Sequence, residues 1–120
     1  MRTITEHVVN AANDRLALVV LDEPGAGGAN HHYRVTGDPD SGVAVDIQFQ
    51  NGPINEVGVN GLTHEVLLAI VADRLRAFQA GPFSCRENAL ALTKIEEAQH
   101  WLHSRTRARM ARGVEGRHKV

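Results

Sequence analysis

A chain of 120 residues with a formal net charge of −1 has the size of one domain and is not a generic binder of polyanions. It contains three Phe, one Trp and one Tyr, so its core must be aliphatic and modest, which favours an oligomer. The single cysteine, Cys85, excludes an internal disulfide and fits a reducing cytoplasm. Because no apolar stretch approaches the length of a membrane span, we expect a soluble, cytoplasmic protein without a membrane partner.

The first half of the chain predicts strands separated by turn residues. Residues 1–15 are compatible with either a short helix or a strand. The apolar run Leu16–Leu21 has the length of a strand, and His31–Val35 predicts a second one. The clearest strand is Val43–Gln50, in which Val, Ile and Phe alternate with Ala, Asp and Gln.

A turn signal follows this strand. Asn51-Gly52 is typical of a β-hairpin, and Pro53 predicts that the return strand, Ile54–Val59, lies at the sheet edge. We therefore expect a small antiparallel sheet with one buried face.

Two helices are predicted in the second half. Thr63 is expected to cap the first, and Gly81-Pro82 ends it. Ser84 stands three residues before Glu87, the spacing of a capping box, so the second helix is expected to start at Ser84. It would run from about Cys85 to about Arg112, or roughly 40 Å. The apolar positions are Leu67, Ile70, Val71, Leu75 and Phe78 in the first helix and Leu92, Ile95, Ala98 and Leu102 in the second.

The short connection between these helices makes them antiparallel neighbours. The sequence thus predicts an α+β fold, a small antiparallel N-terminal sheet followed by an antiparallel hairpin of two long helices. We expect one domain, with a sheet region at about 1–60, the hairpin at about 62–112 and a basic tail at 113–120. The second helix is too long for the rest of so small a domain to cover it along its whole length. Its last turns therefore either stand free or pack on a second chain.

An arginine stripe marks the end of the second helix. Arg105, Arg109 and Arg112 share one face, whereas Arg107 points elsewhere. Such a stripe is often a solvated face, because the helix dipole stabilises positive charges near a helix C-terminus. It is also the chemistry that binds phosphate, since guanidinium groups grip phosphate oxygens in pairs.

Asn88 and Phe78 flank the hairpin turn, far from these arginines. Asn88 precedes Arg105 by seventeen residues, or roughly 25 Å of helix, so no small ligand touches both within one chain. In a two-fold dimer with antiparallel long helices, the turn of one chain would meet the arginines of the other. The resulting pocket would suit a nucleotide, with ring stacking, an amide and guanidinium groups.

Other chemical motifs are weak. The glycine-rich stretch 24–28 lacks the ending of a P-loop, and Cys85 has no marked base. His31-His32 and the pair His100 and His103 are better explained as solvated side chains than as metal ligands. We therefore expect no catalytic residue, no metal and no cofactor.

Four stretches carry a family resemblance: QNGPINEVGVNG, GPFSCREN, the run W-L-x-x-R-T from Trp101 to Thr106, and ARGVEG from Ala111 to Gly116. Together they span about residues 46–116, and the sequence resembles the phage Thoeris anti-defence sponge family there. The first 45 residues match only loosely. The resemblance implies a protein that binds glycocyclic ADP-ribose, made by bacterial TIR-domain enzymes, and holds it without degrading it.

The resemblance also implies partners and site residues. Family members form homodimers with two interface pockets, some assemble into hexamers, and some bind CBASS cyclic oligonucleotides at separate sites through a hairpin shared with an anti-CBASS sponge. Carried over by position, the pocket takes Phe78 and Asn88 from one chain and Arg105 and Arg109 from its partner. The weaker candidates are Arg86, Phe83 and Arg112.

Two alternatives remain open from the sequence. One is an enzyme that hydrolyses a nucleotide signal, which is disfavoured because no metal set or acid–base pair stands out. The other is a small DNA- or RNA-binding protein that uses the C-terminal arginines, which the near-zero net charge disfavours.

Overall fold

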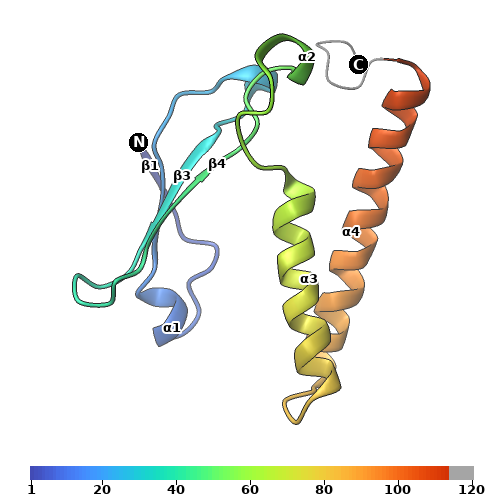
Figure 1. Cartoon of the computed structure of the whole chain (residues 1–120). Coiled ribbons are helices and arrows are strands. Elements are labelled where there is room, and N and C mark those ends of the chain that lie inside the picture. Colours follow the sequence, from blue (N-terminus) through green and yellow to red (C-terminus); the bar gives the residue numbers. More distant parts are fainter. Residues whose placement is uncertain (114–120) are drawn as a thin grey trace. The chain divides into compact units, whose positions relative to one another are not determined.

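The computed structural model describes residues 1–113 and divides the chain into two compact units, Met1–Leu62 and Thr63–Val120 (Figure 1). The first unit holds the strands and the second holds the two long helices. The predicted α+β class is therefore confirmed. The tail expected at 113–120 lies outside the described residues except for Gly113, and the expectation of a single domain stays a prediction.

The first unit is built on a four-stranded antiparallel sheet in sequential order. A short helix, α1, lies between the first two strands, so the ambiguous first 15 residues contain both a strand and a helix. Asn10 caps this helix by accepting the backbone N–H of Asn13. The elements are β1 Arg2–Ile4, α1 Ala11–Asp14, β2 Ala17–Val20, β3 His32–Thr36 and β4 Ala44–Gln48.

The register gives the sheet one polar face across β3 and β4. His32 pairs with Gln48 and Arg34 pairs with Asp46, and residues directly opposite each other share a face. The apolar face is only partly covered. Val20 is 1% exposed, yet Val45 remains 50% exposed, so the expected fully buried face is wrong for β4 in the single chain.

The return strand predicted at Ile54–Val59 is also wrong. The chain forms the one-turn helix α2, Ile54–Val57, instead. A side chain makes hydrogen bonds where strand-to-strand bonds were expected. The Gln50 Nε2 amide donates to the carbonyl groups of Gly52 and Gly58, 3.1 and 2.8 Å away. These hydrogen bonds give partners to two carbonyl groups of the loop that a return strand would otherwise have supplied. A parallel bridge between Phe49 and Leu62 then leads to the second unit.

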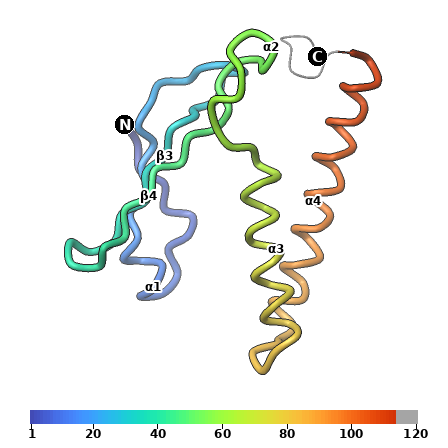
Figure 2. The backbone as a smooth tube through the Cα atoms, in the orientation of Figure 1, coloured from blue at the N-terminus to red at the C-terminus, as the bar shows by residue number. Residues whose placement is uncertain are grey.

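The second unit is a hairpin of α3, His64–Ala80, and α4, Arg86–Ala111, which run side by side in Figure 2. Thr63 caps α3 as predicted, since its Oγ1 accepts the Val66 N–H at 3.2 Å. The cap of α4 is Cys85 and not Ser84. The extended backbone of Cys85 makes Arg86 the first helical residue, and the Cys85 Sγ accepts the Asn88 N–H at 3.4 Å.

The contact face of the hairpin is narrower than the apolar pattern of α3 predicts. Ala72 is 0% exposed, whereas Ile70, Val71 and Phe78 are 54%, 43% and 39% exposed. One neighbouring helix covers only one stripe of α3, so the assignment of these three residues to the contact face is wrong. On α4 the predicted apolar face is confirmed, because its four residues are all half-buried: Leu92, Ile95, Ala98 and Leu102.

The two helices differ in length. α3 has 17 residues and α4 has 26, so α4 is longer by nine residues, or about 14 Å. The arginines near its C-terminus therefore stand on turns for which α3 has no counterpart.

Candidate functional site

Phe78 provides an aromatic surface at the turn end of the hairpin. It lies in the last turn of α3, and its backbone carbonyl accepts the Gly81 N–H. The guanidinium carbon of Arg74 lies 5.4 Å from the ring centroid, so a cation covers one ring face. Arg74 is not among the predicted site residues, although its i, i+4 spacing from Phe78 in the sequence is a signal for this contact.

The other turn-end candidates lie at the start of α4 or just before it. Phe83 is 73% exposed, Arg86 is exposed, and Asn88 is half-buried. The Gln79 Oε1 accepts the Cys85 N–H at 3.0 Å, which ties the end of α3 to the start of α4. Asn88 contributes its backbone N–H to the helix cap, so the cap does not depend on its side-chain amide. Substitution of that amide should thus leave the helix start intact.

The arginine end behaves differently from the expectation in one respect. Arg105 and Arg112 are exposed, but Arg109 is only 9% exposed. The interpretation of the arginine stripe as a solvated face is therefore wrong for Arg109. A helical pattern predicts which residues share a face, whereas the depth of each one depends on packing.

The structure does not bring all the predicted site residues together within one chain. Phe78, Phe83, Arg86 and Asn88 lie at the turn end, while Arg105, Arg109 and Arg112 lie near the other end of α4. Asn88 and Arg105 are seventeen residues apart on continuous helix, a distance of about 25 Å. The predicted site residues of one chain thus fall into two separate groups, which we call the predicted half-sites.

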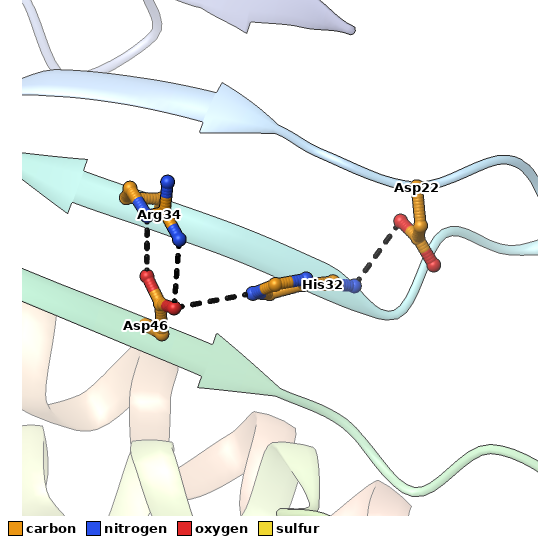
Figure 3. Close-up of polar contacts among 4 residues, drawn as sticks. All are labelled: Asp22, His32, Arg34 and Asp46. Carbon is orange, nitrogen blue, oxygen red and sulfur yellow. Dashed lines mark hydrogen bonds and ion pairs between the residues drawn. The ribbon is translucent and has the colours of Figure 1, made fainter.

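The sheet unit carries a second polar cluster. Arg34 binds Asp46 through two hydrogen bonds, from Nε at 2.6 Å and from Nη2 at 3.0 Å (Figure 3). The His32 Nε2 lies 3.4 Å from the same carboxylate, an ion pair only when the ring is protonated. The Arg34 hydrogen bonds lower the pKa of Asp46 to about 2 despite partial desolvation, and Asp46 in turn raises the pKa of Arg34.

Asp22 anchors the start of β3 beside this cluster. Its two carboxylate oxygens accept the backbone N–H groups of His31 and His32 at 2.9 and 3.1 Å. Partial desolvation raises the pKa of Asp22, but these hydrogen bonds outweigh it and the net shift is downward. The pair His31-His32 is half-buried, so its interpretation as solvated side chains is wrong.

These residues border a cavity of about 240 Å³ in the sheet unit, which we call the polar cleft. Its seven lining residues lie just after β2, at the end of the sheet where β3 starts and β4 ends, and in the loop before α3: Asp22, His31, His32, Gln48, Phe49, Asn51 and Asn60.

Two further findings concern the residues that the structure describes. Among residues 1–113, no group of three or more His, Cys, Asp or Glu side chains could hold a metal ion. Over the same range, no helix is both long enough and apolar enough to cross a membrane.

Comparison with known proteins defines the family to which this chain belongs. The family model described as "Acb2/Tad1, hairpin domain" matches residues 41–107, which include both long helices up to Arg107. The chain therefore belongs to the Acb2/Tad1 hairpin family of phage Thoeris anti-defence proteins. A curated relative, "Thoeris anti-defense 1" from Bacillus phage SBSphiJ7, is 47% identical over 93 residues. The match covers 78% of this chain and 66% of that relative.

Proposed function

We propose that this protein binds glycocyclic ADP-ribose, the Thoeris signal, and sequesters it without cleavage in the cytoplasm of an infected bacterium. Membership of the anti-defence family supports an action against immune signalling. The exposed aromatic rings and arginines of the hairpin support a nucleotide as the ligand.

The observation that carries the proposal is the separation of the two half-sites by about 25 Å of continuous α4. The proposed base-binding residues, Phe78 and Asn88, and the proposed phosphate-binding residues, Arg105 and Arg109, therefore lie too far apart to meet on one small ligand within one chain. A dimer with antiparallel long helices would place Phe78 and Asn88 of one chain beside Arg105 and Arg109 of its partner. Each dimer would then hold two equivalent pockets, flanked by the weaker candidates Phe83, Arg86 and Arg112.

Apolar side chains on the hairpin support a partner copy. Ile70 on α3 and Leu90 and Trp101 on α4 are 54%, 46% and 69% exposed. Exposed apolar residues on both helices are typical of a surface that packs against another subunit. The proposed assembly is a homodimer, and hexamers and a second site for CBASS cyclic oligonucleotides are part of the same family-based proposal.

The chemistry of the pocket supports binding without turnover. Phe and Asn side chains do not titrate in the physiological range, and a guanidinium group stays protonated in proteins. None of the four principal residues is therefore a general base, which hydrolysis of a phosphodiester or glycosidic bond would need. The same residues can still stack a base, hydrogen-bond its edge and neutralise a diphosphate.

The test is to incubate the protein with glycocyclic ADP-ribose, remove free ligand by filtration, heat the protein and analyse the released molecule by mass spectrometry. Release of intact ligand is expected from the parent protein, and a smaller amount is expected from an Asn88→Ala variant. Release of a cleaved product would assign an enzyme instead. Failure to retain any ligand would refute capture of this signal.

A further inference from the structure

Strand β4 forms an open edge of the four-stranded sheet. The order β1-β2-β3-β4 leaves β4 with β3 as its single strand partner among residues 1–113. The return strand predicted for its other side is replaced by the helix α2. An open edge presents backbone N–H and C=O groups that can pair with a strand of another chain. The outer side of β4, which we call the β4 edge, is therefore an interaction surface that the proposed function does not use.

The hydrogen bonds of the sheet show which backbone groups face the β4 edge. The Gly37 N–H donates to the Val43 carbonyl group at 2.9 Å. At the other end of the strand, the Phe49 N–H donates to the His31 carbonyl group at 2.7 Å. Hydrogen-bonded pairs alternate along an antiparallel ladder. The odd-numbered residues of 43–49 therefore bond to β3, and the even-numbered residues point their N–H and C=O groups outward.

The outward groups are occupied at one end of the strand. The Gln48 carbonyl group accepts the Leu62 N–H at 2.8 Å, on the side away from β3. Within residues 1–113, no backbone hydrogen bond reaches the outward groups of Ala44 or Asp46. These two residues thus leave a short stretch of backbone available for a further strand.

The β4 edge lacks the usual protections against pairing with another strand. Many edge strands are protected by Lys, by Pro or by a bulge. The sequence of β4 contains neither Lys nor Pro, and its register with β3 is continuous. Its one charged residue, Asp46, is hydrogen-bonded to Arg34. Val43 and Val45 beside the edge are 40% and 50% exposed, so apolar surface is accessible there as well.

A second copy of β4 fits this edge best in one two-fold register. Because outward pairing joins even-numbered residues, the axis can pass through Ala44, Val45 or Asp46. With the axis at Asp46, each carboxylate lies opposite its own copy, and like charges directly opposite are destabilising. With the axis at Ala44, the apolar Ile47 lies opposite the turn before β4. With the axis at Val45, this residue meets its own copy and Val43 lies opposite Ile47 of the partner.

The register centred on Val45 also satisfies the polar groups. Ala44 of each chain lies opposite Asp46 of the other, and such a pair exchanges two backbone hydrogen bonds. The small Ala44 side chain leaves room for the contact between Asp46 and Arg34. Side chains alternate along a strand, so the apolar residues of 43–47 lie on the face opposite Asp46. The apolar faces of the two sheets then join into one.

We propose that the β4 edge pairs with the β4 edge of a second copy in an antiparallel two-fold interface centred on Val45, which joins the two sheets into one. This interface differs from the hairpin dimer of the proposed function and does not depend on it. A chain that uses two different two-fold interfaces links more than two copies, in a closed ring or an open filament.

The test compares the assembly mass of the full chain with that of Val45→Lys and Val45→Glu in analytical ultracentrifugation. Each substitution places like charges opposite each other at the axis, which prevents pairing. Val45 is half exposed in the single chain, so both variants should fold. Each variant alone is expected to contain about half as many chains per assembly as the parent, or fewer. A monomeric parent, or equal masses for the parent and both variants, would overturn the proposal.

An equimolar mixture of the two variants tests the register. The introduced ammonium and carboxylate groups then face each other across the axis, and opposite charges in this position are favourable. The mass of the parent assembly is therefore expected to return. A mixture that keeps the mass of the separate variants would refute the placement of Val45 on the axis.

A second variant and a control complete the experiment. Ala44→Pro removes an outward N–H and no hydrogen bond to β3, so it should lower the assembly mass as the Val45 variants do. It decides the question if the charged variants lose the circular dichroism of the folded chain. The matched control is Val9→Lys, because Val9 is 80% exposed and lies outside the strands. This control should keep the mass of the parent, and the same loss of mass in it would contradict a specific role for the β4 edge.

Ligand capture separates this inference from the proposed function. Val45→Lys should still capture glycocyclic ADP-ribose, because the predicted half-sites lie in the other unit, Thr63–Val120. A lower mass for this variant, with no capture by the parent protein, would refute only the proposed function. An unchanged mass with retained capture would refute only the β4 interface.

Discussion

Mixed dimers provide the strictest test of a pocket shared between chains. The perturbation combines one chain carrying Arg105→Ala with another carrying Asn88→Ala. Both changes should leave the fold intact, because Arg105 is exposed and the α4 cap uses only the backbone of Asn88. Arg109 is unsuitable for this purpose since it is only 9% exposed.

The magnitude follows from the chemistry of each contact. Loss of a charge-assisted hydrogen bond to phosphate costs about 1.5–3 kcal/mol, so Arg105→Ala homodimers should bind about 10- to 150-fold more weakly. Loss of a neutral amide contact at Asn88 costs about 0.5–1.5 kcal/mol, or about 2- to 13-fold. In a heterodimer with shared pockets, one pocket carries both defects and the other carries none.

The assay is calorimetric titration of glycocyclic ADP-ribose into an equimolar mixture of the Arg105→Ala and Asn88→Ala proteins after their subunits have exchanged. Random exchange makes half of the dimers heterodimers, so about one quarter of all pockets should regain the affinity of the parent protein. The control uses Arg107→Ala, an exposed arginine of α4 outside the proposed pocket, which should bind like the parent. If no tight site returns in the Arg105→Ala and Asn88→Ala mixture, the pocket does not span two chains and the reasoning is refuted.

Three further predictions concern stability. Arg109→Ala should lower the free energy of unfolding by about 1–3 kcal/mol, whereas Arg105→Ala changes it by less than about 0.5 kcal/mol; equal thermal midpoints for both variants would contradict the burial of Arg109. The pKa of Asp46 is depressed to about 2 from 3.8, so its stabilising effect is present above pH 3.8 and is lost as the pH falls through about 2. The difference in midpoint between the parent and Asp46→Asn should therefore shrink below about pH 4, modestly because the carboxylate is 41% exposed, and a constant difference would argue against the Arg34 contact. Gly61→Ala should lower the free energy of unfolding of the sheet unit by about 1–3 kcal/mol in denaturant titration, because the new Cβ overlaps the Phe49 backbone. A free energy of unfolding equal to that of the parent protein would show that the loop moves aside at no cost.

Local signals in the sequence predicted the hairpin and most of the sheet. Thr63 and the Gly81-Pro82 pair mark helix ends through backbone chemistry that acts within a few residues. The alternation in Val43–Gln50 and the periodic apolar residues of α4 likewise reflect geometry along the chain. The division of the candidate site into two half-sites could be predicted for the same reason, since residue count fixes distance along a helix.

Contacts between distant residues decided the rest. Residues 54–57 form a helix in a loop whose carbonyl groups at Gly52 and Gly58 accept from the Gln50 side chain, a contact that the local sequence pattern does not reveal. The exposure of Phe78 depends on which stripe of α3 finds a neighbour, and the burial of Arg109 does not follow from its position in the helical pattern. The polar cleft joins Asp22 to residues up to Asn60, so its hydrogen bonds and its shielded histidine nitrogen arise only when the strands pair and the loop closes.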